Sequence, residues 1–425
     1  MVRFGSTKAK LAANSQRVQC INLLAPQPNM AAHAGLGELT LAKACVNGGN
    51  QALDLCFRVY HVLAERGDDD LALLVLEQGV KTAGCLFGFA VELMRMLAQP
   101  MHAQPRRPHG RPLDVMELPD GIFRARFRFA KADLVEVAGL LGLPPTVVGV
   151  RRDKVDRATA LCYLLARYAY PNRVTVELPM LFRRSSGHLR DIIQAVERLL
   201  LLHWEAKICF DRRGMELRAV QYSECIFRKS QNLMPYCVGF IDGTVRATCK
   251  PTIHQTQYYS GHKRHHAVKY QSVTTPDGLI LSMFGAIPGR NDDRTMLLQS
   301  HLVDYLDAAP RHPHGPPFVV YGDSGYSRSL FVATGYNSVN TTDAQKRFNR
   351  TMSRIRETVE WGFGRISTYF AFCDFKKNQK VWLQPLRTQY LLMALLSNCL
   401  SCYYGNQTAT YMECRPPTIE EYLKY

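Results

Sequence analysis

Asp242, Asp323 and Glu360 are the residues whose types and positions could do chemistry together. Asp242 follows the apolar run YCVGFI, Asp323 ends the run PFVVYGD, and both runs are typical of strands buried on two faces. Carboxylates at the carboxyl ends of neighbouring strands lie at the crevice where α/β folds bind ligands. Each aspartate alone could equally be a turn former. Because both predicted strands end in an aspartate, we favour the interpretation that the two side chains line a ligand-binding crevice.

The third carboxylate, Glu360, belongs to a helix predicted over residues 342–370. The apolar stripe of this helix steps by three or four residues and comprises Phe348, Met352, Ile355, Val359, Phe363 and Ile366. At about 100° per residue, Glu357 points away from the stripe into solvent. Glu360 lies at the edge of the stripe, from which it can reach a crevice beside the sheet. The alternative role for Glu360 is an i,i+4 ion pair with Arg356.

Three clustered carboxylates repel each other unless a cation neutralises them. Oxygen ligands suit Mg²⁺ or Mn²⁺, and two such ions about 4 Å apart can assist phosphodiester cleavage. We therefore predict that the three carboxylates are catalytic and bind divalent metal. Nearby basic residues are predicted to contact nucleic-acid phosphates, with a solvated basic face as the alternative; they are Lys263, Arg264, Lys346, Arg347 and Arg350.

The composition agrees with a nucleic-acid partner. The chain has 425 residues, 53 Lys and Arg against 36 Asp and Glu, and a formal net charge of +17. This balance favours a polyanion, with DNA or RNA first and an acidic membrane surface second. No apolar run reaches the ~18 residues of a membrane-spanning helix, so we expect no membrane partner. With 13 Cys, the density is that of a reduced intracellular protein.

The amino-terminal half is predicted to be mainly helical. We expect a flexible basic arm over residues 1–30, a helical region over 31–98 and a linker rich in proline over 99–120. A second helical region follows over 121–235. Residues 155–203 within it have the pattern of a helix-turn-helix, whose last helix would be capped by Ser185 or Ser186 and would expose Arg190, Gln194 and Arg198. Plain helical packing is the alternative.

Residues 236–425 are predicted to form an α/β domain with a mixed sheet. Two apolar runs flank Pro276-Asp277-Gly278 and indicate a hairpin, while residues 295–306 indicate a helix between the hairpin and the next strand. The order of strand, hairpin, helix, strand and long helix is typical of a mixed central sheet.

The sequence of this predicted domain also resembles that of a known family. Residues 236–423 resemble the nuclease domain of the PIF/Harbinger-type DDE transposases, a group that includes the Harbinger transposase-derived nucleases. The matching stretches, in order, are FIDGT at 240–244, YYSGHKRHHAVKYQ at 258–271, PDGLI at 276–280, GRNDD at 289–293, YGDSGY at 321–326, FNRTMSRIRETVEWGFGRI at 348–366 and PPTIEEYL at 416–423. Their order and spacing make the resemblance far more specific than any single motif.

The resemblance implies an RNase H-like fold and a metal-dependent DNA endonuclease or transposase with strand transfer. It assigns catalysis and metal binding to Asp242, Asp323 and Glu360. A fourth metal-associated aspartate matches Asp293, with Asp292 where the family usually has His, so the choice between the two stays open. DNA is the expected partner, together with a separate Myb-like DNA-binding protein.

Location and assembly follow from the expected substrate. We expect the nucleus, with the cytoplasm as the alternative, and a homodimer because paired-end cleavage favours one. Two other functions compete with the transposase-like enzyme. One is a domesticated, catalytically idle module that binds DNA or protein, and the other is a nuclease directed at structured DNA or at RNA.

Overall fold

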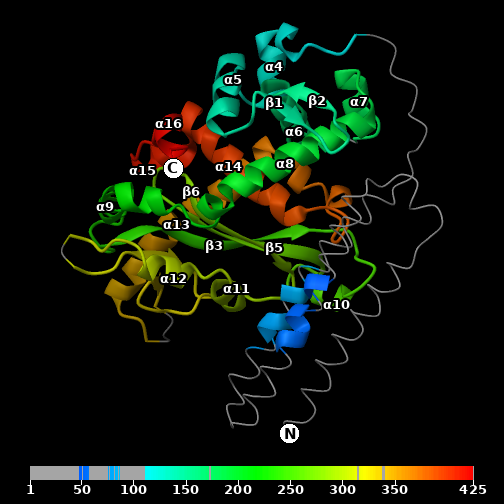
Figure 1. The fold of residues 1–425 in the computed structure, drawn as a ribbon. Helices are drawn as coiled ribbons and strands as arrows, with labels where there is room; N and C mark the ends of the chain where they lie inside the picture. The colour runs from blue at the N-terminus through cyan, green and yellow to red at the C-terminus, as the bar shows by residue number, and fades with distance from the viewer. Residues whose placement is uncertain are drawn as a thin grey trace. The chain divides into compact units, whose positions relative to one another are not determined.

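The chain divides into two compact units, Met1–Pro105 and Arg106–Tyr425 (Figure 1). The computed structural model describes residues 47–49, 51–56, 75, 77–80, 82–84, 86, 111–171, 174–313, 315–336 and 340–424. The described residues of the first unit are helical. The predicted basic arm and most of the predicted linker lie outside the described residues. In the described part of the chain, no helix has the length and apolar character needed to cross a bilayer.

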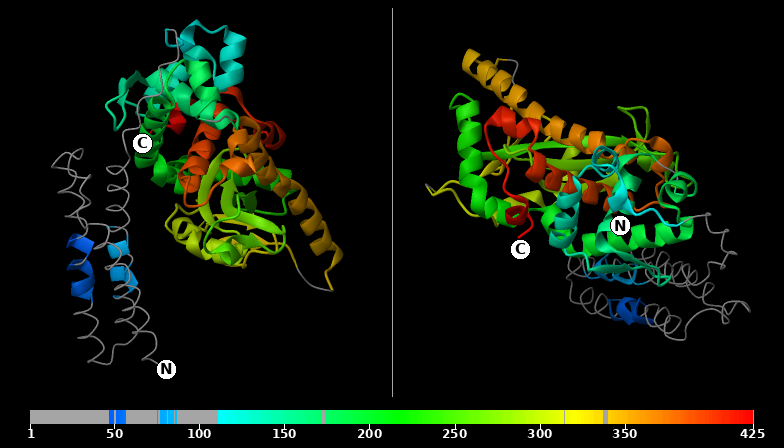
Figure 2. Two further views of the ribbon diagram at one scale, coloured as in Figure 1. Left: turned by 90° about the vertical axis from the view of Figure 1, so that its right-hand side faces the viewer. Right: turned by 90° about the horizontal axis from the view of Figure 1, so that it is seen from above.

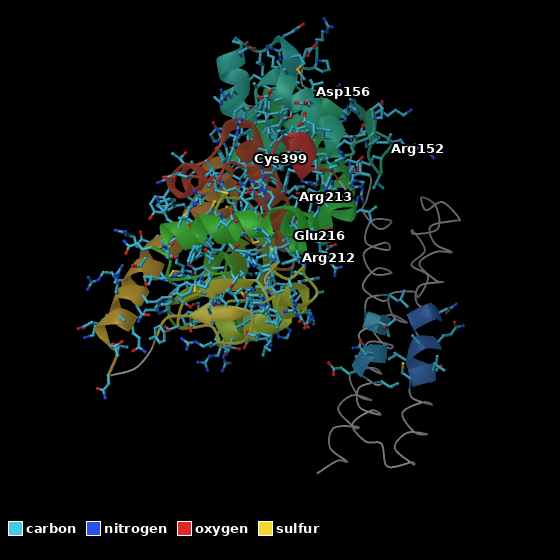
Figure 3. The ribbon with its side chains drawn as sticks, turned by 90° about the vertical axis from the view of Figure 1, so that its left-hand side faces the viewer. Arg152, Asp156, Arg212, Arg213, Glu216 and Cys399 are labelled. Carbon is cyan, nitrogen blue, oxygen red and sulfur yellow. The ribbon has the colours of Figure 1, made fainter. Side chains whose placement is uncertain are left out.

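Helices form the first part of the second unit, together with a small hairpin. The elements in chain order are η1 (Val115–Glu117), α4 (Asp120–Phe127), α5 (Lys131–Leu140), β1 (Thr146–Val148), β2 (Lys154–Asp156), α6 (Arg157–Ala169), α7 (Glu177–Phe182), α8 (Ser186–Cys209) and α9 (Arg212–Lys229). Asp156 caps α6 by accepting a hydrogen bond from the Thr159 amide, and Figure 3 labels this residue. Ser185 caps α8 in the same way from the His188 amide.

The helices α6, α7 and α8 correspond to the three segments of the predicted helix-turn-helix. Arg190, Gln194 and Arg198 are exposed along α8, while Leu189, Ile193 and other apolar residues of the same helix are buried. DNA recognition by α8 stays a prediction.

A mixed sheet forms the centre of the second part. Its strands are β3 (Cys237–Ala247), β4 (Tyr259–Ser260), β5 (His265–Thr274), β6 (Ile280–Pro288), β7 (Val319–Gly322) and β8 (Val332–Thr334). The sheet has the order β4-β5-β3-β7-β8, and β6 pairs with β5. The β3-β5 and β5-β6 pairs are antiparallel, whereas β3-β7 and β7-β8 are parallel. The predicted α/β fold with a mixed central sheet is confirmed.

The remaining elements are α10 (Gln255–Tyr258), α11 (Asp293–Gln299), α12 (Leu302–Asp307), α13 (Asp343–Tyr369), η2 (Ala371–Cys373), η3 (Lys376–Asn378), α14 (Leu386–Tyr404), α15 (Gln407–Met412) and α16 (Ile419–Tyr422). The single helix predicted over 295–306 is two helices, because the chain turns at His301 with a φ of 54°. The long helix is confirmed as α13, whose N-terminal turns extend away from the sheet (Figure 2).

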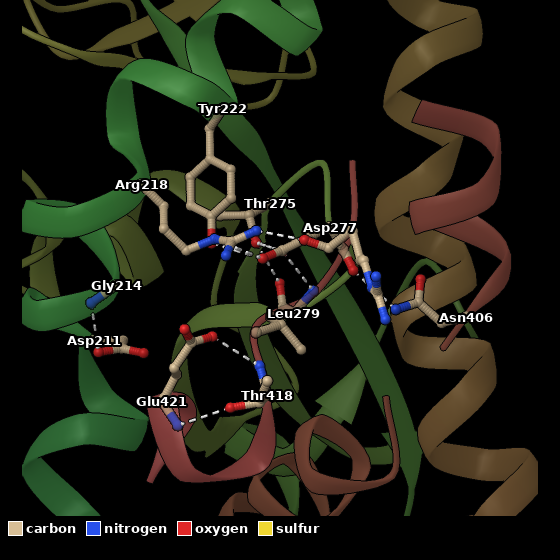
Figure 4. A network of polar contacts seen from close by, with 11 residues as sticks. Asp211, Gly214, Arg218, Tyr222, Thr275, Asp277, Leu279, Asn406, Thr418 and Glu421 are labelled. Carbon is tan, nitrogen blue, oxygen red and sulfur yellow. Dashed lines mark hydrogen bonds and ion pairs between the residues drawn. The ribbon is translucent and has the colours of Figure 1, made fainter. Parts of the chain in front are cut away.

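One buried acid, Asp277, forms hydrogen bonds and an ion pair that connect the β5-β6 turn to α9. Asp277, in the turn between β5 and β6, is 0% exposed. Its carboxylate accepts hydrogen bonds from the Tyr222 hydroxyl at 2.7 Å, the Thr275 hydroxyl at 2.5 Å and the Leu279 amide at 3.1 Å (Figure 4). Arg218 on α9 lies 3.6 Å away as an ion-pair partner. The hairpin turn is thereby fixed to α9.

Candidate active site

The parallel pairing of β3 with β7 brings Asp242 and Asp323 to the same level of the sheet. Phe240 pairs with Tyr321 across these strands, so the residues two positions further along each strand are Asp242 and Asp323. Asp323 follows directly after the last residue of β7 and also accepts a hydrogen bond from the Gly325 amide at 2.9 Å. The two carboxylates predicted from separate apolar runs are therefore neighbours.

Asp242 lies partly buried in an environment that disfavours its charge. Burial is the main cause that raises its pKa to about 6, and the negative charges of Asp323 and Glu360 raise it further. Two contacts act in the opposite direction. Nη1 of Arg356 lies 3.1 Å from Oδ2, and the Gly243 amide donates to Oδ1 at 2.8 Å. The influence of both other acids on Asp242 shows that the three form one electrostatic cluster.

Glu360 joins this cluster from α13. This helix begins after a capping box at Thr342, and its predicted apolar stripe is buried from Met352 to Ile366, with Phe348 partly buried. Glu360 and Glu357 are both exposed, and the charge of Glu360 is among the causes that raise the pKa of Asp242. The ion pair found for Arg356 runs to Asp242. The helix therefore supplies both an acid and a cation to the site.

Asp293 is the fourth acid, and the structure distinguishes it from Asp292. The carboxylate of Asp292 caps α11 by accepting from the Thr295 amide at 2.8 Å. A hydrogen bond with the Thr295 side chain, and then this amide hydrogen bond, lower the pKa of Asp292. Asp293 points elsewhere: a Cβ atom placed on Gly325 would lie 3.2 Å from Oδ2 of Asp293 and 3.0 Å from Oδ1 of Asp323. The carboxylates of Asp293 and Asp323 thus border the same space.

Glycine at positions 243 and 325 keeps this space open. A Cβ atom on Gly243 would lie 2.9 Å from Cε of Met296 and 3.1 Å from Oδ1 of Asp293. A separation under about 3 Å cannot be tolerated without displacement of one of the groups. Side chains at either glycine would therefore crowd the acids.

Two contributors to the site were missed in the sequence. Nζ of Lys269, on β5, lies 2.7 Å from Oδ1 of Asp293. Tyr326 has a buried hydroxyl with no hydrogen-bond partner among the described residues. Burial is the main cause that raises the pKa of this hydroxyl, and the negative charges of Asp293, Asp242 and Asp323 raise it further. The YGDSGY segment contained Tyr326, but nothing in its spacing indicated that the hydroxyl faces the acids.

The donor set fits a hard divalent cation. Four carboxylates and one unpaired hydroxyl supply only oxygen, which Mg²⁺ and Mn²⁺ prefer. Among the described residues, no three His, Cys, Asp or Glu side chains are already arranged to ligate a single ion. Arg356 and Lys269 instead neutralise Asp242 and Asp293. A metal ion would have to compete with these two protein cations.

Residues 241–396 match the family model described as DDE superfamily endonuclease. This match supports a DDE transposase-like family for the domain. It begins one residue before Asp242 and includes Asp293, Asp323 and Glu360. No curated protein and no solved structure matched the chain. With the curled mixed sheet and the helical region before it, the match confirms the predicted RNase H-like α/β fold.

The five predicted phosphate-binding residues of the DDE-like domain fall into two separate groups. Lys263 and Arg264 are exposed in the turn between β4 and β5. Lys346, Arg347 and Arg350 are exposed in the first turns of α13, where the ring of Phe348 lies 6.1 Å from that of Tyr321 on β7. These turns lie at the opposite edge of the sheet from β4. The acids lie between the two groups, so neither group is part of the acid cluster itself.

The cysteine pair of α14 is a poor metal site. Cys399 and Cys402 have a spacing found in zinc proteins, but Cys399, which Figure 3 labels, is fully buried. Burial raises the pKa of the Cys399 thiol to about 12. The thiolate that metal binding requires is therefore disfavoured.

Proposed function

We propose that this protein is a divalent-metal-dependent DNA endonuclease of the PIF/Harbinger transposase type. The observation that carries the proposal is the electrostatic cluster of Asp242, Asp323 and Glu360, from two neighbouring parallel strands and one long helix. Like charges placed together repel each other, and those of Asp323 and Glu360 help to raise the pKa of Asp242. Such repulsion is unfavourable for a protein that has no cation to bind there. The match to the DDE superfamily endonuclease family supports the same reading.

Asp242, Asp323, Glu360 and Asp293 would hold Mg²⁺ or Mn²⁺. When bound, such ions supply Lewis acidity to the attacking and leaving oxygens of a phosphodiester. In the hydrolytic step, the oxygen of water forms a bond to phosphorus while the bond from phosphorus to the 3′-oxygen breaks. The 3′-oxygen takes up a proton, which leaves a 3′-hydroxyl and a 5′-phosphate. In strand transfer, the oxygen of that 3′-hydroxyl would form a bond to the phosphorus of a second phosphodiester. The bond from that phosphorus to its own 3′-oxygen would break, and the released 3′-oxygen would take up the proton of the attacking hydroxyl.

The other residues of the site position these groups. Arg356 holds Asp242, and Lys269 holds Asp293, at hydrogen-bonding distance. With a cation bound at the acids, Arg356 and Lys269 would be available to contact the phosphate oxygens of DNA. The buried hydroxyl of Tyr326 can donate to an acid or to a bound water.

We propose the nucleus as the place of action, with the cytoplasm as the alternative, because the substrate is DNA. A homodimer would place two sites on paired DNA ends, and a separate Myb-like protein would supply sequence recognition. These partners rest on the resemblance to the Harbinger group.

The experiment that tests the function is DNA nicking by the purified chain with Mn²⁺ or Mg²⁺, with EDTA as the metal-free control. Glu360→Gln should reduce nicking by about a thousandfold, since electrostatic groups at the reacting centre contribute on this order. Glu357→Gln is the matched control on the same helix and should keep full activity. Nicking that persists in Glu360→Gln would refute the assignment of the helix carboxylate.

A second function is favoured by the ion pairs of Arg356 and Lys269. These internal cations already neutralise two of the acids, as they would in a domesticated module that binds DNA or protein without cleavage. DNA binding without nicking, on both plain and branched duplexes and in either metal, would support that module.

A further inference from the structure

We propose that a surface made by residues 249–254 and 375–383 binds an unpaired DNA strand beside the cleaved phosphodiester. We call it the lysine–tryptophan surface. The inference rests on the proposed nuclease function and deepens it, because it names the form of DNA that the site accepts. Lysines would contact the phosphates, and the exposed indole of Trp382 would stack on a base.

The fold holds the two segments of the lysine–tryptophan surface together. The Cys249 amide donates to the carbonyl of Gln379 at 2.8 Å, which joins the chain after β3 to the turn after η3. The ring of Trp382 lies 6.2 Å from that of Tyr258 in an edge-to-face contact and 6.4 Å from that of His254. The indole is therefore positioned by its neighbours, which lowers the entropy cost of binding.

The charge of the lysine–tryptophan surface is of one sign. Its exposed cations are Lys250, Lys376, Lys377 and Lys380, and neither segment contains Asp or Glu. The neighbouring acid, Asp374, forms an ion pair with Arg246. Burial is the main cause that lowers the pKa of His266, and the positive charges of Lys250 and Lys376 lower it further. A polyanion is the matching partner.

Exposed rings give the lysine–tryptophan surface a second feature. Trp382 is 61% exposed and Phe375 is 41% exposed, with Ile253 and Leu383 also exposed. A contiguous exposed apolar patch rimmed by polar residues marks a binding surface. Aromatic rings interleaved with lysines are the arrangement by which proteins bind single strands, where each base offers a face for stacking. Bases paired within a duplex do not offer that face.

The strand β3 connects the acid cluster to the lysine–tryptophan surface. Side chains two apart on a strand share a face, and both Asp242 and Arg246 contact α13, through Arg356 and the carbonyl of Phe363. Arg246 also reaches Asp374, at the edge of the surface. Seven residues of extended chain, from Asp242 to Cys249, span about 23 Å, or about seven nucleotide steps. A strand cleaved at the acids would thus reach the surface within a few nucleotides.

The test measures DNA binding by the full chain in EDTA, so that no cleavage occurs. A labelled blunt duplex is compared by fluorescence anisotropy with the same duplex carrying a single-stranded extension of about eight nucleotides. We expect the extension to tighten binding, and Trp382→Ala to weaken binding of the extended duplex about tenfold, since stacking contributes on this order. Binding of the blunt duplex should stay within about twofold. Trp382→Phe, which keeps a ring, should retain most of the preference.

A charge series provides the second arm of the test. Changing Lys376, Lys377 and Lys380 to Gln should reduce the slope of log K against log salt concentration by about two. Each phosphate contact on a single strand contributes about 0.7 to that slope. The matched control changes three exposed cations elsewhere to Gln, namely Lys154, Arg212 and Arg415. This control should leave the preference for the extended duplex unchanged.

Several outcomes would overturn the inference. They are a wild-type chain that binds both duplexes equally, an equal loss on both duplexes in Trp382→Ala, and a control triple variant as weak as the test variant. A Trp382→Ala chain that binds DNA normally but changes its oligomeric state would identify a protein interface instead. Failure of the nuclease proposal is separate, because Glu360→Gln should abolish nicking while it leaves the binding of extended DNA intact.

Discussion

Asp242 and Asp277 are two aspartates of the same sheet with opposite surroundings. Asp277 is fully buried and accepts three hydrogen bonds, with Arg218 as its ion-pair partner. Asp242 is less buried, has one arginine and one backbone amide, and faces other acids. Burial of a charge is tolerated when its hydrogen bonds are complete, as at Asp277. The incomplete neutralisation of Asp242 by the protein indicates a site that requires an additional ligand.

We expect substitution of Asp277 to reduce stability and substitution of Asp242 to reduce activity, and these are the largest effects that we expect. Asp277→Ala leaves the hydroxyls of Tyr222 and Thr275 and the guanidinium of Arg218 without their acceptor. It should reduce the free energy of unfolding by about 3–5 kcal/mol. At pH 4, where the folded chain holds Asp242 protonated, Asp242→Asn should change that free energy by about 1 kcal/mol or less. At the pH of the nicking assay it should reduce nicking about a thousandfold. Thermal unfolding and nicking rates check both variants. Equal destabilisation by both substitutions would remove the distinction.

The pH dependence of stability should also separate Asp242 from an ordinary surface acid. Because the pKa of Asp242 is raised to about 6 in the folded chain, its protonated form favours folding. This contribution is complete below the unfolded pKa of about 4 and is lost as the pH rises through about 6. It amounts to about 3 kcal/mol. Unfolding of wild-type and Asp242→Asn chains in EDTA from pH 4 to pH 7 measures it, and parallel stability curves would contradict it.

The sequence located the three central acids because local rules are sufficient for them. Apolar runs predicted the strands before Asp242 and Asp323, and the stripe of α13 separated Glu360 from Glu357. The partners of these acids depend on long-range pairing, which no local pattern reports. Arg356 was considered as a partner of Glu360, whereas the register of α13 against β3 directs it to Asp242. Lys269 reaches Asp293 because β5 pairs with β6, and α11 begins at Asp293 shortly after β6 ends.

Short elements and helix caps also could not be predicted from the sequence. The strand β8 has three residues, too few for a periodic signal, and the break between α11 and α12 depends on the backbone of His301. The choice between Asp292 and Asp293 required the position at which α11 begins. Once that position is known, Asp292 is the cap and Asp293 is free to face Gly243.

The smallest expected effect concerns these two adjacent aspartates. Asp292→Ala removes the cap of α11 and should reduce the free energy of unfolding by about 1 kcal/mol, with nicking nearly unchanged. Asp293→Asn keeps the cap and should reduce nicking by about tenfold to a hundredfold. Thermal unfolding and nicking assays on the two single variants distinguish these outcomes. A greater loss of nicking in Asp292→Ala would exchange the roles of the two residues.

The most direct test of the central claim is to locate the metal by cleavage of the protein backbone. Fe²⁺ bound in place of Mg²⁺ generates hydroxyl radicals with ascorbate and peroxide, and these cut the chain near the ion. We predict fragments that end near Asp242, Asp293 and Asp323, suppressed by excess Mg²⁺ and absent in Asp242→Asn. Cuts near Asp277 or Cys399, or cuts unaffected by Mg²⁺, would contradict the assignment of the metal to this cluster.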